Sequence, residues 1–200
     1  MSEAVGSSRS DPFQAWREPW DHEFQSVFLA ARDGQGWALS ELYRSLFPRI
    51  LQYLEAVEPA EAEGIACDTW LDVVDGLERF QGDEAGLRAL SFTVARRRLL
   101  DLRRRRALGR APGTPGSRAQ AWPTNGHQES AVSPVGTAID LITSSLTPEE
   151  ADVVLLRVIG DLDVDAVAGI VGSGPSNVRL LQHRAVRRLA RVLETEGVIR

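Results

Sequence analysis

The chain has 200 residues, a net charge of −5 and a single cysteine, Cys67. This length allows one or two small domains, and the lone cysteine excludes an intramolecular disulfide and fits a reducing compartment. No apolar run approaches the roughly 20 residues of a membrane span, and the amino terminus lacks a signal peptide's basic-then-apolar order, so we expect a soluble, cytoplasmic protein. Arginines gather in 96–106 and 179–191, and acidic residues in 55–84 and 147–165, which suggests basic surfaces for nucleic acid beside acidic surfaces for a basic protein.

The first half of the chain has the apolar periodicity of helices. Residues 1–20 are rich in Ser, Pro and charge, which predicts a disordered tail. Apolar residues at three- and four-residue spacing then predict four helices, which cover about 21–33, 39–54, 59–80 and 84–106. Pro48 is expected to kink the second helix, and Trp70 and Leu71 to be buried by the third. No segment alternates with the period of a strand, so 21–106 is predicted to be an all-α domain.

The composition changes sharply between 107 and 136. Pro, Gly, Ser and Thr dominate this stretch, which predicts a flexible linker between the first domain and a second helical domain at 137–195. Thr147 and Glu150 have the spacing of a capping box at a helix start, and Gly160 is expected to end that helix. We interpret the acidic residues that follow, Asp161 and Asp163, as loop and helix-start residues rather than as metal ligands.

Residues 164–189 have the pattern of a helix-turn-helix. Ala168 is the small residue where two helices meet, Gly172 suits a left-handed turn, and Pro175 suits the first turn of the second helix. The outer face of this second helix carries side chains that can reach phosphates and base edges in a major groove, namely Arg179, Gln182, His183, Arg184, Arg187 and Arg188. An ordinary helical hairpin with a solvated basic face is the alternative.

A second basic feature is the arginine run at 96–106. Leu99 and Leu102 hold this segment on the core, so its arginines belong to a folded helix that can bind phosphates. Asp101 is expected to pair with Arg97, Arg98 or Arg105. The alternative is a solvated helix end whose cations favour the negative pole of the helix dipole.

Three groups of residues carry a resemblance to a known family. They are 41–51, then Phe80 with 87–96 and 100–106, and finally 146–150 with 155–157 and 178–189. In this order they resemble the opening of the first domain, the −10-reading segment and the −35-reading domain of extracytoplasmic-function (ECF) sigma factors, RNA polymerase subunits of the bacterial sigma-70 family. The resemblance implies an all-α fold with two domains.

The resemblance also implies partners and site residues. The first domain would bind the clamp coiled coil of core RNA polymerase and help to melt promoter DNA, the second would dock on the polymerase flap, and an anti-sigma protein would regulate the chain. The implied DNA-binding residues are Arg88, Arg96, Arg97, Arg98, Arg103 and Arg104 in the first domain, and Ser176, Asn177, Arg179, Gln182, His183, Arg184 and Arg187 in the second. The implied polymerase-binding residues are Glu61, Gly64, Cys67, Asp68 and Leu71.

Two other functions remain open at this point. One is a stand-alone helix-turn-helix regulator that binds duplex DNA without polymerase, and the other is a sigma-like adaptor that binds only proteins. An enzyme is not expected, because no nucleophile with a neighbouring base, phosphate-binding loop or metal cluster is recognisable. No cofactor or metal is expected either.

Overall fold

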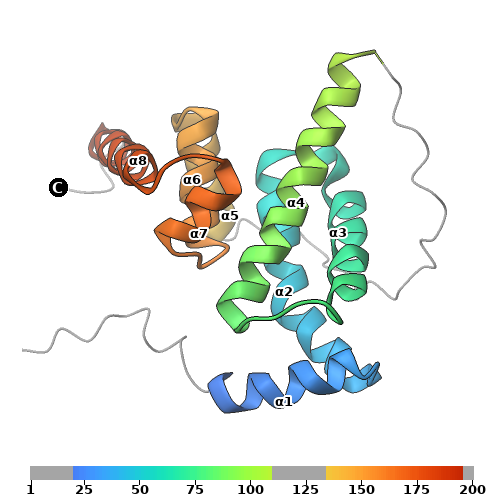
Figure 1. Ribbon diagram of the computed structural model, residues 1–200. Helices are drawn as coiled ribbons and strands as arrows, with labels where there is room; N and C mark the ends of the chain where they lie inside the picture. Colours follow the sequence, from blue (N-terminus) through green and yellow to red (C-terminus); the bar gives the residue numbers. More distant parts are fainter. Residues whose placement is uncertain (1–19, 110–133, 196–200) are drawn as a thin grey trace, which may run out of the picture.

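The computed structural model describes residues 20–109 and 134–195. The predicted tail up to residue 19 and most of the predicted linker, residues 110–133, lie outside the described residues. Within the described ranges every regular element is a helix, which confirms the all-α fold (Figure 1). No helix of these ranges is long and apolar enough to cross a membrane.

The first half contains the four predicted helices. They are α1 (Trp20–Arg32), α2 (Gly36–Val57), α3 (Ala62–Gly76) and α4 (Glu84–Ala107), with a short 3-10 turn, η2 (Pro59–Glu61), before α3. Pro48 lies inside α2 without ending it. The third helix is shorter than predicted, since it ends at Gly76 rather than at Phe80.

Burial on α3 differs from the expectation. Leu71 was predicted to be buried but is 45% exposed, because it lies on the side of α3 that no other described helix covers. Trp70 is half-buried and meets the ring of Tyr43 edge-on at 5.3 Å between ring centroids. Apolar spacing therefore located the helix correctly and misassigned one position of its buried face.

The second half contains α5 (Pro134–Ser145), α6 (Pro148–Val158), α7 (Val164–Val171) and α8 (Pro175–Thr195). The predicted capping box is confirmed at the start of α6. The backbone N–H of Glu150 donates to Thr147 Oγ1 at 3.3 Å, and the backbone N–H of Thr147 donates to the Glu150 carboxylate at 3.1 Å. These bonds satisfy two of the donors that a helix start leaves free.

The turn between α7 and α8 has the geometry of a helix-turn-helix. Gly172 has φ 71°, in the left-handed region that most side chains avoid, and its N–H donates to the Ala168 carbonyl. Val167 and Ala168 of α7 and Val178 of α8 are buried together, and Pro175 is the first residue of α8. The turn predicted from the sequence is confirmed.

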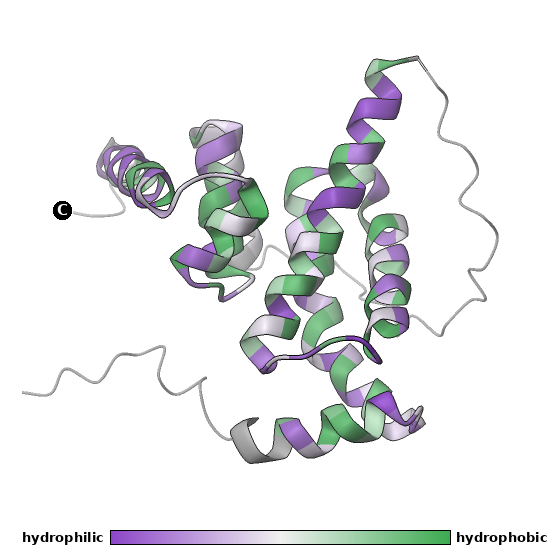
Figure 2. Cartoon of the chain, in the orientation of Figure 1, coloured by the Kyte–Doolittle hydropathy of each residue, from purple (hydrophilic) through white to green (hydrophobic). Residues whose placement is uncertain are grey.

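The two halves lie against each other. α4 contacts α7, and α2 contacts α5 and α6. One continuous cluster of buried apolar side chains includes Tyr53 and Phe92 of the first half and Leu156 and Val167 of the second. Figure 1 shows the second half beside α4, with α8 on the side away from it. Figure 2 shows hydrophilic residues along α8 and towards the C-terminal end of α4.

Two glycines provide a test of the packing inside the second half. A Cβ on Gly160 would lie 2.5 Å from the Leu156 carbonyl oxygen, so we expect Gly160→Ala to lower the free energy of unfolding by about 1–3 kcal/mol. At Gly169, inside α7, an added Cβ would meet nothing within 4 Å. Gly169→Ala is therefore expected to raise the free energy of unfolding by about 0.5–1 kcal/mol. Urea unfolding of both variants measures the difference, and a loss of equal size in both would contradict the packing at Gly160.

Candidate nucleic-acid interface

Helix α8 packs on the second half through one narrow side. Val178 and Ala185 are buried and Leu181 and Leu189 are half-buried, at the spacing of one helix face. The opposite side is polar and open to solvent. The predicted DNA-binding residues Ser176, Asn177, Arg179, His183, Arg184 and Arg187 are all exposed on α8, and Gln182 is half-buried.

Three arginines on this exposed side lack an acidic partner among the residues that the structure describes. Arg179, Arg184 and Arg187 form no ion pair with any described residue, whereas Arg188 lies 3.6 Å from the Glu150 carboxylate. Asn177 donates through Nδ2 to Ser173 Oγ at 2.9 Å, which holds its amide beside the turn. The exposed side of α8 therefore offers positive charge and polar groups on a helix. An anion can bind these side chains without breaking an existing ion pair.

The predicted DNA-binding residues of α4 fall into three groups by their surroundings. Arg88 and Arg96 face the second half, and their side chains are 14% and 20% exposed. Arg98 and Arg103 are tied to acidic residues of the first half, as described below. Arg97 and Arg104 are 65% and 72% exposed and are the most accessible of the set.

Arg98 bridges α4 to α3. Its guanidinium lies 2.7 Å from the Asp72 carboxylate and 3.0 Å from that of Asp68. The hydrogen bond to Asp72 raises the pKa of Arg98, so this side chain stays charged. Asp101 pairs with Arg104 at 3.0 Å rather than with the arginines expected from the sequence, because the Arg104 side chain reaches back one turn to meet it.

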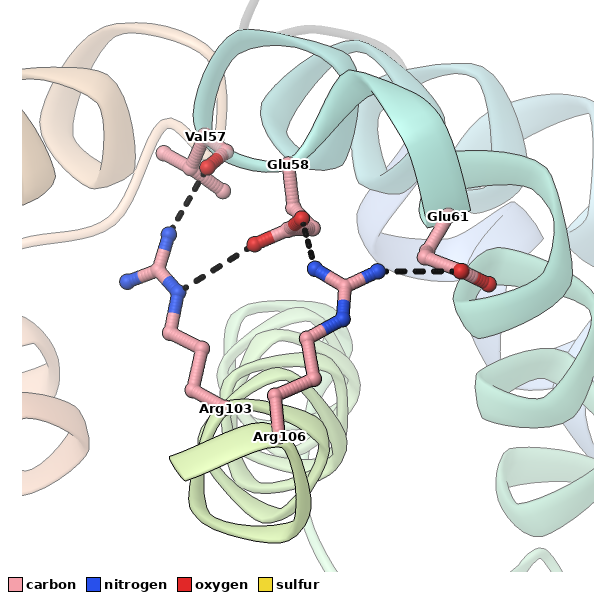
Figure 3. A network of polar contacts seen from close by, with 5 residues as sticks. All are labelled: Val57, Glu58, Glu61, Arg103 and Arg106. Carbon is pink, nitrogen blue, oxygen red and sulfur yellow. Dashed lines mark hydrogen bonds and ion pairs between the residues drawn. The ribbon is translucent and has the colours of Figure 1, made fainter. Parts of the chain in front are cut away.

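Glu58 holds the C-terminal end of α4 against the junction of α2 and α3 (Figure 3). Its carboxylate accepts hydrogen bonds from Arg106 at 2.5 Å and from Arg103 at 3.4 Å, while Arg103 also donates to the Val57 carbonyl at 2.7 Å. Arg106 reaches Glu61 at 3.0 Å. Burial raises the pKa of Glu58, but the two arginines outweigh it and leave the pKa lowered.

The predicted polymerase-binding residues of α3 share one side of the helix. Gly64, Cys67 and Leu71 are exposed, and Asp68 is half-buried beneath Arg98. Partial desolvation and the charges of Glu63 and Asp68 raise the pKa of the Cys67 thiol, which disfavours its thiolate form. Glu61 lies in η2 rather than on α3 and is occupied by Arg106.

Sequence reasoning missed the polar contacts between the two halves. Tyr53 Oη donates to Asp152 at 2.6 Å, and Arg96 donates to the same carboxylate at 2.9 Å and to the Ile170 carbonyl at 3.3 Å. Arg88 meets Asp161 at 2.6 Å. Asp152 directly precedes the apolar run 153–156 of α6, which was the available signal, but nothing local indicates partners so far away in the chain.

The fold and the exposed basic helix define an all-α protein with a helix-turn-helix suited to DNA. No protein-family model matches the chain. It is similar to the ECF RNA polymerase sigma factors SigD of Mycobacterium tuberculosis and of Mycobacterium bovis, with 26% identity over 173 residues, covering 82% of this chain and 81% of each relative. These relatives confirm the resemblance to ECF sigma factors predicted from the sequence.

A solved structure shares the fold. The structure of CnrH in complex with the cytosolic domain of CnrY aligns with a TM-score of 0.58 and 16% identity, and covers 84% of this chain and 96% of that one. The alignment includes both halves of the chain, so CnrH and this chain share the same all-α fold.

The Glu58 contacts predict a pH-dependent stability. Because the pKa of Glu58 is lower in the folded than in the unfolded chain, its stabilising contribution is complete above the unfolded pKa and is lost as the pH falls through the folded one. We expect Glu58→Gln to lower the free energy of unfolding by about 1–2 kcal/mol at neutral pH, with the difference closing in acid. Urea unfolding across pH measures this difference, and Glu55→Gln, exposed in the last turn of α2 just before Glu58, is the control. A difference that persists in acid would contradict the role of the charge.

Proposed function

We propose that this chain is an alternative sigma factor, which binds core RNA polymerase and directs it to promoters through two DNA-facing helices. The observation that carries the proposal is the exposed surface of α8, where Arg179, Arg184 and Arg187 form no ion pair with any described residue. This helix belongs to a helix-turn-helix in a chain that is similar over 82% of its length to ECF sigma factors. The proposed activity makes and breaks no bonds. The protein contributes binding free energy to polymerase at a promoter and is a regulator rather than an enzyme.

α8 is the proposed reader of the −35 element. Its first turns project Ser176, Asn177 and Arg179 from a helix end that the Gly172 turn leaves uncovered. A recognition helix places its N-terminal residues on base edges in the major groove, while residues further along contact phosphates. We assign the second role to Arg184 and Arg187, which are exposed further along α8.

α4 is the proposed contact for the −10 element. Arg97 and Arg104 are the most exposed of the predicted DNA-binding arginines of this helix, and each has one weak or local acidic partner. A cationic helix that binds the backbone of a single strand stabilises melted DNA relative to the duplex. Arg88 and Arg96 belong to the same proposed surface but face the second half here.

α3 is the proposed docking face for the clamp coiled coil of core polymerase, and the second half is proposed to meet the flap. Gly64, Cys67 and Leu71 form an exposed face of small and apolar side chains bordered by Asp68. An apolar centre with a charged border is typical of a protein interface. An anti-sigma protein as regulator and a cytoplasmic location complete the proposal.

The deciding experiment is co-elution of the purified chain with bacterial core RNA polymerase, followed by transcription from a pool of promoter-enriched fragments. A stable complex that yields discrete start sites supports the sigma function. Absence of a complex with retained binding to specific duplex DNA would point to a stand-alone regulator, and loss of both would point to an adaptor.

Replacement of Arg179 tests whether α8 recognises the −35 element. We expect Arg179→Ala to weaken binding to a duplex that carries the −35 sequence from a mapped promoter by about 1–3 kcal/mol, and to weaken binding to random duplex less. Fluorescence anisotropy at fixed salt measures both. Arg191→Ala, exposed near the other end of α8, is the matched control and should affect both duplexes alike. Equal losses for Arg179→Ala would show that this arginine neutralises phosphate without reading bases.

Replacing Leu71 tests the polymerase face. We expect Leu71→Ala to weaken binding to core polymerase by about 1–2 kcal/mol, because the interface would lose apolar contact. Leu29→Ala is the matched control, since Leu29 is 53% exposed on α1, outside the proposed face, and Leu71 is 45% exposed. Titration of labelled protein with polymerase gives the affinities. An unchanged affinity for Leu71→Ala would place the polymerase contact elsewhere.

A further inference from the structure

Helix α8 carries a leucine that lies outside the apolar core. Leu180 is 45% exposed, whereas the next residue, Leu181, packs against the cluster of buried apolar side chains. Val178 and Ala185 mark the buried side of α8, and a residue two positions after the first and five before the second lies roughly opposite both. A single exposed leucine is ordinary on a protein surface, so what distinguishes Leu180 is where it lies.

The surroundings of Leu180 are polar and cationic. Residues three, four and seven positions away along a helix share its side, and here they are Ser176, His183, Arg184 and Arg187, all exposed. Neither of these arginines forms an ion pair with a described residue, and the same holds for Arg179, directly before the leucine. An apolar side chain therefore lies within a group of polar side chains and unpaired positive charges.

This combination restricts the partner. An apolar protein surface or a lipid chain that covered Leu180 would also strip water from the neighbouring arginines, which is costly for a cation without a new partner. α8 contacts α5, α6 and α7, and Figure 1 shows it on the side of the second half that faces away from α4. The partner that fits is a polyanion with its charges at the edges and an apolar group between them.

The major groove of DNA has this character. Phosphates border the groove, and the base edges form its floor, where thymine is the one unmodified base that presents an apolar group, its 5-methyl. Arginines that bind phosphates would direct the leucine between them towards the base edges. A leucine packs on a methyl group without loss, whereas it leaves the amino or carbonyl group of another base without a hydrogen bond.

We propose that Leu180 is a specificity-determining residue, which recognises the 5-methyl group of one thymine in the major groove. The proposal deepens the assignment of α8 to the −35 element and rests on it. It adds a base that is selected by apolar contact, beside those that Arg179 and its polar neighbours select by hydrogen bonds.

Uracil substitution tests the contact with the smallest chemical change. Duplexes are first selected from a randomised pool by the purified full-length chain, without polymerase. The enriched duplex is then synthesised with deoxyuridine in place of each thymine in turn, which removes the methyl and keeps every hydrogen-bonding group. We expect one position at which this change weakens binding by about fourfold, as the burial of one methyl-sized group predicts. Fluorescence anisotropy at fixed salt measures the affinities.

Variants of the leucine assign the effect to this side chain. In Leu180→Ala the thymine and uracil duplexes should bind equally, whereas Leu180→Met, which keeps an apolar side chain of similar reach, should retain the difference. Val186→Ala is the matched control, because Val186 is 56% exposed on the same helix, about 9 Å further along its axis. This control should keep the full fourfold difference.

Four results would overturn the proposal. They are a pool that yields no preferred sequence, an enriched duplex with no position sensitive to uracil, a difference that persists unchanged in Leu180→Ala, and an equal loss by this variant on thymine and uracil duplexes. A variant that loses affinity for core polymerase but keeps the thymine preference would also overturn it, because the leucine would then contact a protein.

The outcome is separable from that of the proposed function. The duplex measurements contain no polymerase, so absence of co-elution with core polymerase would refute the sigma function while the uracil result still decides the role of Leu180. A stable polymerase complex with no uracil effect would do the reverse. Circular dichroism melting verifies the fold of each variant, and Leu180→Gln, which keeps a good helix former, replaces Leu180→Ala if that variant does not fold.

Discussion

The structure depends on how the positive charge of α4 is balanced. Arginines crowd the C-terminal half of this helix, where the helix dipole favours cations but their mutual repulsion does not. One side of α4 is neutralised by carboxylates of the first half, namely Glu58, Asp68 and Asp72. Another side of α4 is neutralised by two carboxylates of the second half, Asp152 and Asp161. Because these carboxylates belong to different neighbours, the ion pairs also orient α4 between α3 and the second half.

The two helices proposed to bind nucleic acid differ in how their arginines are paired. Arg179, Arg184 and Arg187 of α8 have no acidic partner among the described residues, so an incoming phosphate displaces only water and counterions. Most arginines of α4 must exchange a carboxylate for a phosphate, a replacement of one charge-assisted hydrogen bond by another. Binding of a phosphate at α4 would therefore yield less net free energy than at α8, because the carboxylates of neighbouring elements must first release the arginines.

Local chemistry explains which features could be predicted from the sequence. The Thr147–Glu150 capping box and the left-handed Gly172 involve residues within one turn, so their spacing alone predicts them, and the periodicity of apolar residues located the helices. The Tyr53–Asp152 bond joins residues 99 positions apart, and nothing in either neighbourhood indicates the other. Periodicity likewise showed that Leu71 lies on a helix but not whether any element covers that side.

The absence of a side chain at Gly64 has a consequence for the proposed docking of a partner on α3. Nothing lies within 4 Å of where its Cβ would be, and the neighbouring Cys67 is also small, so this side of the helix is notched. A partner that fits the notch touches main-chain atoms, whereas a partner shaped for an ordinary helix leaves a void there. An alanine at this position would stabilise the helix and fill the notch. At Gly64, a gain in helix stability would therefore come with a loss of selectivity for the partner.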